Sequence, residues 1–328
     1  DVHAWGVWFG LEDWDHYSDH GGRFASEYGL QSLPNLHTLR EAGISALDDE
    51  ALQFRQRSRM EWLEPGFDGW DMMRHFMAKT VGLPEDGNLE DWITRSQMTQ
   101  AEGIRQALER HRTSQGRHAG SLYWSLNDVW PAVSWSSVDH AGRWKLAHHA
   151  ARRANAPLAV IWDRTREDSL QFMVFNDLQS PAKGILTVTC SSIEGDVLKR
   201  DSMDVDLDGR SSGTFSFGEA SSWRPKPTTS YLSWSWHIPD TPCEGSSLWT
   251  SVASAELGPP TLEISATDSS LAMTTDLYVP AVHLVANVPG HFSDNGMPLL
   301  PGARTKVRFV PESPSHDMDL QFEVRLGQ

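Results

Sequence analysis

The pattern of apolar residues changes at Pro157, and this change constrains the fold more than any other feature of the 328-residue sequence. Before it, residues 88–116 carry apolar side chains at helical spacing, with Asn88 as a candidate N-cap and acidic residues in the first turn. After it, apolar or alternating runs are separated by turn residues at fairly regular intervals, which is typical of antiparallel β-sandwiches. We therefore predict an α/β region followed by all-β structure.

The all-β part divides again within the sequence ELGPPT, residues 256–261, where Pro and Gly indicate a linker. The predicted domains are therefore residues 1–158, 159–255 and 256–328. The first is predicted to be α/β, and the other two are predicted to be small immunoglobulin-like β-sandwiches, because similar runs and turn signals occur in both.

Two short apolar segments of the first domain are predicted strands. RFASE, residues 23–27, ends at Glu27, and GSLYWSL, residues 120–126, leads into a polar and aromatic segment. Helical sequences follow both, after Pro34 and over 143–157. A strand followed by a helix is the unit of α/β barrels, which keep their active sites at the carboxyl ends of the strands.

The charge balance excludes several classes of partner. The sequence holds 44 acidic and 28 basic residues, for a formal net charge of −16. Because phosphate binding needs clustered Lys and Arg, this balance argues against nucleic acid, and also against an anionic membrane surface. No apolar run of about 18 residues is present, so no membrane span is predicted. Neutral ligands are unaffected by this charge.

Cysteine usage and the N-terminal residues leave the cellular compartment open. Cys190 and Cys243 are too few for a disulfide framework or a zinc site, and they can form one disulfide or none. The chain begins at Asp1 without a basic n-region or an initiator methionine, so we expect a processed product or a piece of a longer protein. No metal or cofactor is expected, and His148 and His149 are expected on a helix surface.

Glu27 is a single carboxylate within the small, apolar and aromatic run GGRFASEYGLQS. It can be a structural cap or ion-pair partner, or it can be a catalyst at the end of a barrel strand. Retaining glycosidases need two carboxylates about 5 Å apart, one a nucleophile and the other an acid/base. The fifteen tryptophans bear on this choice, because most fill cores but some can stack on sugar rings. They cluster around Trp5 and around Trp124.

Five segments resemble the β-mannosidases of glycoside hydrolase family 2. The family's nucleophile strand is similar to RFASEYGLQS, and its last barrel strand and helix are similar to GSLYWSLNDVWPAVSWSSVDHAGRWKLAHHAARR. DVHAWGVWFG resembles the family's aromatic loop after the sixth strand. QAEGIRQALERHR resembles its penultimate long helix, and HFSDNGMPLLPG resembles a motif of its last sandwich domain. The resemblance implies the C-terminal part of a (β/α)8 TIM barrel followed by two immunoglobulin-like β-sandwich domains.

The resemblance also implies an activity and a set of site residues. The enzyme would be an exo-acting, retaining glycoside hydrolase that releases terminal non-reducing β-D-mannose from an oligosaccharide or a glycoprotein-derived glycan. Glu27 aligns with the nucleophile, which attacks C1 and forms a covalent glycosyl-enzyme. Trp124 falls where the family places a ring against the −1 sugar, and Trp5 and Trp8 fall on the loop that lines the pocket. The other substrate-binding candidates are His3, Asn127 and Asp128.

Several of these side chains have a structural alternative. Asp128 either contacts the sugar or braces its loop through backbone bonds, and His3 is either a site residue or an ordinary loop residue. Trp130 and Trp135 are interpreted as packing residues. The tryptophans of the first sandwich are interpreted as core or interface residues: Trp223, Trp234, Trp236 and Trp249.

The partner acid is not evident in this sequence. The family's acid/base is a Glu that follows an Asn at the end of the fourth barrel strand, and no Asn-Glu pair occurs here. Two or three barrel strands also leave open sheet edges and an uncovered core. We therefore expect the acid/base upstream of residue 1, on polypeptide that completes the barrel, and we expect the chain alone to be inactive. The other acids weighed are Glu12, Asp13, Asp15 and Asp19, expected to be solvated, and Glu61 and Glu64, in a segment that departs from the family.

Two alternatives to the β-mannosidase hypothesis remain open. One is another exo-β-glycosidase of the same family, of the glucosaminidase or galactosidase type, because residues upstream contribute to sugar specificity. The other is a non-catalytic carbohydrate-binding fragment. A binding module needs aromatic platforms but no carboxylate at a strand end, so Glu27 is the feature that favours an enzyme.

Overall fold

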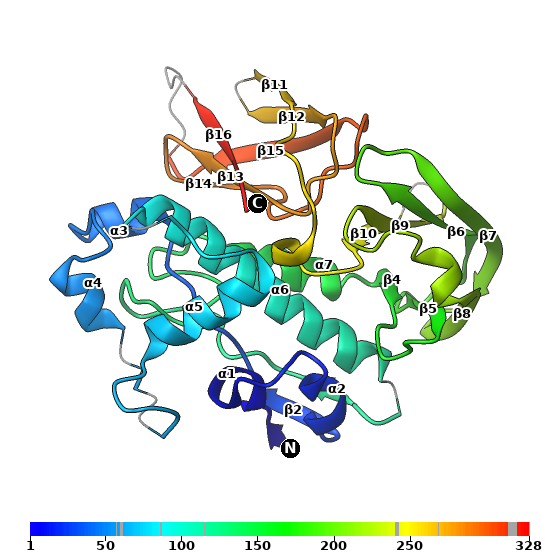
Figure 1. The fold of residues 1–328 in the computed structure, drawn as a ribbon, viewed down its shortest axis with the longest axis horizontal. Helices are drawn as coiled ribbons and strands as arrows, with labels where there is room; N and C mark the ends of the chain where they lie inside the picture. Colours follow the sequence, from blue (N-terminus) through cyan, green and yellow to red (C-terminus); the bar gives the residue numbers. More distant parts are fainter. Residues whose placement is uncertain are drawn as a thin grey trace.

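The computed structural model describes residues 1–56, 58–59, 62–85, 87–114, 116–239, 243–267, 269–313 and 320–327. Figure 1 shows a helical group at the lower left with the N-terminus, a β group at the right, and a second β group above them. The long helix α6 (Leu89–Thr113) runs through the middle. Each group has its own cluster of buried apolar side chains.

The N-terminal group contains a small parallel sheet of three strands. These are β1 (Val2–His3), β2 (Phe24–Glu27) and β3 (Gly120–Ser121), which pair in that order. Strand β2 confirms the strand predicted up to Glu27. The strand predicted over 120–126 is regular only at its first two residues, because the chain beyond Ser121 diverges into a long loop.

Two predicted helices of this group are confirmed, and another was not foreseen. Asn88 caps α6, since its side chain accepts from the backbone N–H groups of residues 90 and 91 at 3.1 Å each. Helix α7 (Leu146–Ala154) is the predicted helix before Pro157. Helix α5 (Gly69–Thr80), which begins with a capping box, was missed. The shorter helices are α1 (Gly6–Gly10), α2 (His16–His20), α3 (Leu36–Glu41) and α4 (Glu50–Arg55).

No helix in the described part of the chain is long and apolar enough to cross a membrane. One side-chain prediction on α7 is wrong. His149 is buried rather than at the surface, with its Nδ1 atom 3.6 Å from a carboxylate oxygen of Asp294, because α7 packs this face against the second β group. His148, its neighbour, is half-buried.

The first β group forms two antiparallel sheets around one core. One sheet has the order β10-β9-β6-β7 and the other β4-β5-β8. The core contains Trp223, Trp234 and Trp236, which confirms their interpretation as core residues, and Trp249 packs against it. Cys190 and Cys243 are both free. The strands are β4 (Leu158–Trp162), β5 (Ser169–Asn176), β6 (Ala182–Ser192), β7 (Val197–Leu207), β8 (Ser211–Glu219), β9 (Ser230–His237) and β10 (Cys243–Leu248).

The second β group also has two antiparallel sheets. Their orders are β11-β12-β15-β14 and β13-β16, and apolar side chains of both sheets share one core. Short 3-10 helices, η1 (Ala220–Trp223) and η2 (Val252–Ser254), lie before this group. Its strands are β11 (Leu262–Thr267), β12 (Ser270–Thr275), β13 (Val282–Ala286), β14 (Gly290–Phe292), β15 (Thr305–Pro311) and β16 (Phe322–Leu326).

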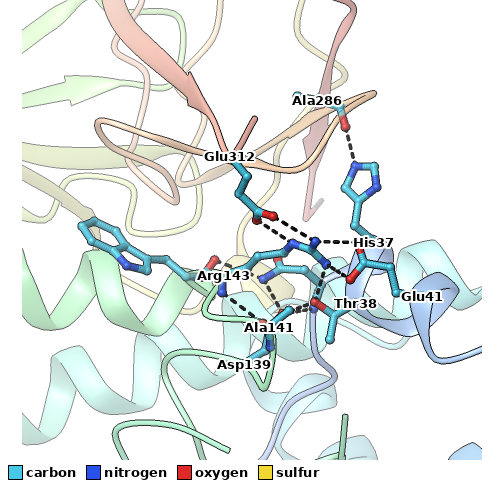
Figure 2. Close-up of polar contacts among 10 residues, drawn as sticks. His37, Thr38, Glu41, Asp139, Ala141, Arg143, Ala286 and Glu312 are labelled. Carbon is cyan, nitrogen blue, oxygen red and sulfur yellow. Dashed lines mark hydrogen bonds and ion pairs between the residues drawn. The ribbon is translucent and has the colours of Figure 1, made fainter. Parts of the chain in front are cut away.

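A buried arginine ties the second β group to the helical group (Figure 2). The Arg143 guanidinium donates to Glu41 at 2.6 Å and to Glu312, at the end of β15, at 2.7 Å. It also donates to the Thr38 hydroxyl at 3.0 Å, and this hydroxyl donates to the buried carboxylate of Asp139 at 2.8 Å. Two bidentate ion pairs on one guanidinium fix the orientation of the two groups.

Candidate functional site

Glu27 lies at the carboxyl end of β2, where His3 of the neighbouring strand β1 and Trp5, between β1 and α1, lie against its carboxylate. Trp5 donates its indole N–H to Glu27 Oε2 at 3.0 Å, and His3 Nδ1 lies 3.3 Å from the same oxygen. The backbone is fixed as well, because the N–H of Ala4 donates to the Glu27 carbonyl at 2.7 Å. The Glu27 side chain remains 26% exposed, so the carboxylate is oriented and still accessible.

Trp124 reaches the same edge of the sheet from the loop after β3. Its backbone N–H donates to the carbonyl of Tyr28 at 2.8 Å, one residue beyond Glu27. Its side chain is 47% exposed. The Trp124–Ser125 peptide bond is cis. Trp124 therefore presents an open aromatic surface next to the Glu27 strand.

A glycine allows this close approach. A Cβ atom on Gly29 would lie 2.2 Å from the carbonyl oxygen of Trp124, far inside van der Waals contact. The sequence shows Gly29 only as part of the quoted run, and nothing in its spacing indicates this requirement. Any larger residue would push the aromatic loop away from Glu27.

Two roles were considered for Asp128, a contact with the sugar and the bracing of its loop. The structure contains hydrogen bonds of the bracing kind. Its carboxylate accepts hydrogen bonds from the hydroxyls of Ser134 at 2.7 Å and Ser136 at 2.6 Å. Asp128 therefore stabilises the loop through side-chain hydroxyls, whereas backbone hydrogen bonds were expected. Asn127 is exposed, and its backbone forms an isolated bridge with Val138. The loop around Trp124 is thus folded back on itself.

The tryptophans of the region divide into buried and exposed ones. Trp8 is only 1% exposed and stacks on Phe76, so its ring lies in the core and does not line the surface beside Glu27, contrary to expectation. Trp135 packs against the Trp5 ring with centroids 6.1 Å apart, as expected for a packing residue. Trp130, also interpreted as a packing residue, is 49% exposed in this chain.

Gln100, on α6, is a buried polar residue that was not predicted from the sequence. Its amide nitrogen donates to the carbonyls of Leu30 at 2.8 Å and Trp135 at 3.0 Å, and its oxygen accepts from the Ser32 hydroxyl at 2.7 Å. It therefore joins the segment after Glu27 to the aromatic loop. A glutamine on the buried face of an amphipathic helix was the available signal.

The other acids of the region lie in different surroundings. Asp13 pairs with Lys79, Asp15 pairs with Arg110 at 2.7 Å, and both carboxylates are largely exposed. Glu12, Asp19 and Glu64 are exposed too, and Glu61 lies outside the described residues. None of the described members of this set hydrogen-bonds to the side chains of His3, Trp5 or Glu27. Within the described ranges, no group of three or more His, Cys, Asp or Glu could hold a metal ion.

The chain is similar in sequence to known proteins. The Ig_mannosidase family, an Ig-fold domain, matches residues 257–326. Beta-mannosidase A of Aspergillus niger is 31% identical over 216 residues, which is 56% of this chain and 23% of the fungal protein. Beta-mannosidase A of Aspergillus oryzae is 27% identical over 340 residues, which is 90% of this chain and 36% of that protein.

Solved structures share the fold over nearly the whole chain. A β-D-mannosidase from Dictyoglomus thermophilum superposes with a TM-score of 0.82 at 21% identity, covering 99% of this chain and 40% of that one. An exo-chitosanase from Amycolatopsis orientalis superposes with a TM-score of 0.73 at 15% identity, covering 98% and 43%. The chain therefore spans less than half the length of each of these relatives.

Proposed function

Because this chain is related to the C-terminal portion of the β-mannosidases of glycoside hydrolase family 2, we propose that it carries the nucleophile of a retaining exo-β-mannosidase. The observation that supports this proposal most directly is the carboxylate of Glu27. It lies at a strand end, accepts from Trp5 at 3.0 Å and remains accessible, and the exposed residue Trp124 is hydrogen-bonded through its backbone to the next residue, Tyr28.

The two oxygens of Glu27 have different roles in this proposal. Oε2 is occupied by Trp5 and His3, whereas Oε1 has no hydrogen-bond partner among the described residues. Oε1 is therefore the atom that attacks C1 of the mannoside, forming the covalent glycosyl-enzyme as the leaving oxygen departs. Water then attacks C1 from the same face as the departed group, and the Glu27 carboxylate is released.

The side chains around Glu27 bind and orient the sugar. The Trp124 ring offers its apolar face to the −1 mannose, and Trp5 fixes the carboxylate while its ring borders the same space. His3 is 57% exposed, and its Nδ1 atom lies 3.3 Å from Glu27 Oε2. Asn127 is an exposed polar contact for the substrate, and Asp128 acts by holding the loop. The substrate class is a β-mannoside oligosaccharide or a glycoprotein-derived glycan.

The proposal requires a second piece of polypeptide. Residues 1–158 would be the last strands of a (β/α)8 barrel, with sandwich domains at 159–255 and 256–328. Strands β1 and β3 are the open edges of the parallel sheet, and an upstream segment would pair with them. That segment would also supply the acid/base. The chain's coverage of only 23–36% of the fungal relatives supports this division.

A Glu27→Ala variant of the complete enzyme tests the nucleophile. Turnover of a nitrophenyl β-mannoside should be abolished, and azide should restore it by attacking C1 directly, giving a glycosyl azide of inverted configuration. Glu12→Ala, on the exposed loop, is the matched control and should retain activity. Rates of the Glu27→Ala enzyme within about tenfold of the wild type would refute the assignment.

The exo-chitosanase similarity raises a glucosaminidase as the second candidate, since the two enzymes share this fold. A panel of nitrophenyl β-glycosides on the complete enzyme separates the candidates. We expect the mannoside to have the highest kcat/KM, and a preference for glucosaminide or galactoside would favour the alternative. No turnover of any glycoside would favour the carbohydrate-binding fragment.

A further inference from the structure

Lys145 is a fully buried lysine directly before α7, and neither the motifs nor the proposed chemistry uses it. Its side chain is completely inaccessible. Its Nζ atom lies 3.4 Å from the carbonyl oxygen of Ser32 and 3.3 Å from that of Ser134. These two serines already form an isolated antiparallel bridge through their backbone groups. The ammonium therefore adds a third connection at one point of backbone pairing.

Burying an ammonium is costly unless its charge is compensated. Burial lowers the pKa of Lys145 to about 8, and the nearby carboxylates of Asp128 and Asp139 act in the opposite direction. Among the described residues, no carboxylate oxygen lies within ion-pair distance of Nζ. An apolar side chain of similar volume would generally be as stable here, so stability alone gives little reason for a lysine.

The two carbonyls belong to the two segments that form the candidate site. Ser32 lies five residues after Glu27, on the segment whose Tyr28 carbonyl accepts from Trp124. Ser134 lies on the aromatic loop, and its hydroxyl donates to Asp128 at 2.7 Å. Any change in the separation of Ser32 and Ser134 changes the position of the Trp124 loop relative to the Glu27 strand.

We propose that Lys145 is a positioning residue that sets the separation between the Glu27 carboxylate and the Trp124 ring by holding the Ser32 and Ser134 carbonyls together. The catalytic part of this inference rests on the proposed function, whereas the positioning of the loop does not. The ammonium attracts both carbonyls without contacting the sugar. Asp128 and Asp139, one before and one after Ser134 along the loop, favour the charged form of the buried ammonium.

Two other side chains near Lys145 also connect segments of the candidate site, and neither of them is a cation. Gln100 joins the same segments from α6 with neutral hydrogen bonds. Asp139 accepts from the Asn35 backbone at 3.1 Å and belongs to the Arg143 network of Figure 2, which ties the loop to the second β group. Lys145 lies between these connections and is the cationic one directed at the Ser32–Ser134 bridge.

Lys145→Met in the complete enzyme is the first test, because methionine keeps the length and apolar character of the stem. We expect the protein to fold, and we expect kcat/KM for a β-mannoside to fall by roughly 10²-fold, mainly through kcat. Lys183→Met is the control, since Lys183 is exposed and pairs with Asp206 on the first β group. Unchanged kcat/KM in folded Lys145→Met would overturn the proposal.

Hydrogen exchange on the complete enzyme tests the loop without reference to activity. In Lys145→Met the amides of residues 122–138 should exchange at least about tenfold faster than in the wild type, and those of the β groups should not change. Equal exchange would overturn the proposal even if the complete enzyme hydrolyses mannosides. Faster exchange in a protein that lacks glycosidase activity would support the positioning role and refute the proposed function. If Lys145→Met does not fold, Lys145→Gln, whose shorter and neutral side chain cannot hold both carbonyls, should give the same local increase, and equal exchange in that variant and the wild type would overturn the proposal.

Discussion

The N-terminal sheet and the first β group bury their apolar side chains in different ways. In the β group, two antiparallel sheets face each other and share one core, so each covers the inner face of the other. The N-terminal sheet has three short parallel strands, and large apolar side chains near it stay exposed, with Val129 at 86% and Leu122 at 59%. Parallel sheets are normally covered on both faces.

The difference shows which region of the chain covers its own apolar surface. The first β group buries its own apolar side chains between its two sheets. The sheet that carries Glu27 leaves apolar side chains exposed, and these are suited to packing against further polypeptide. The candidate site lies in the second kind of region. Its geometry is therefore held locally by buried polar contacts such as those of Gln100 and Asp128, and less by a surrounding sheet.

Substituting close-packed glycines should give the largest loss of stability in both regions. A Cβ at Gly29 would lie 2.2 Å from the Trp124 carbonyl oxygen, and one at Gly184 would lie 2.1 Å from that of His237 in the first β group. We expect each Gly→Ala change to lower the free energy of unfolding by about 3 kcal/mol, measured by denaturant titration.

The activity of the same variants in the complete enzyme sharpens the comparison. Per folded molecule, Gly29→Ala should lose most of its kcat/KM, because the loop moves away from Glu27, and Gly184→Ala should keep it. If Gly29→Ala retains wild-type activity and stability, the close approach of Trp124 to the Glu27 strand is not required.

Acid should destabilise the N-terminal region through a buried histidine. His111 packs between Tyr28 and His118, and burial lowers its pKa to about 4. Its pKa in the folded chain lies below that of an unfolded histidine, so its contribution to stability is lost as pH falls from about 6.5 toward 4. We expect a loss of about 2 kcal/mol by pH 5 from this residue.

The measurement is the free energy of unfolding at pH 7 and pH 5. His111→Phe, which keeps an aromatic ring, should reduce the difference between the two pH values by about 2 kcal/mol relative to the wild type. His237→Phe, at an exposed position of β9, should leave it unchanged. An identical pH dependence in His111→Phe and the wild type would contradict the burial of a neutral imidazole.

The smallest effect on stability is expected for the exposed apolar surface. Leu126→Ser combined with Val129→Ser should change the free energy of unfolding by less than about 0.5 kcal/mol. The same pair should lower the fluorescence of the dye ANS bound to this chain by about half. Val197→Ser with Leu198→Ser, on exposed positions of β7, is the control and should lower it much less. Equal effects of the two pairs would show that the surface near β3 is not special.

The sequence predicted the elements whose signals are local. The cap at Asn88, the strand that ends at Glu27 and the alternating runs after Pro157 each depend on neighbouring residues, and the structure contains all three. Predictions failed where a side chain's surroundings come from distant segments. Trp8 and His149 are buried, although the family resemblance placed Trp8 on a loop that lines the pocket and His149 was expected on a helix surface.

The candidate site divides in the same way. The run RFASEYGLQS singled out Glu27 without any coordinates, because it resembles the family's nucleophile strand and places a lone carboxylate at a predicted strand end. Gly29, Gln100 and Lys145 had no comparable signal. Their roles depend on backbone atoms of Trp124, Leu30 and Ser134, which are close only in the folded chain.

The sequence by itself determined the α/β and all-β division, the principal helix and the candidate nucleophile, because periodicity, capping and motif are properties of neighbouring residues. Only the tertiary structure decided which atoms hold Glu27 and the aromatic loop in place. The N–H groups of Trp5 and Trp124 and the ammonium of Lys145 act at distances of 2.8 to 3.4 Å between segments that are 22 to 113 residues apart in the chain. Hydrogen bonds depend on such distances and on direction, and neither can be read from the order of residues.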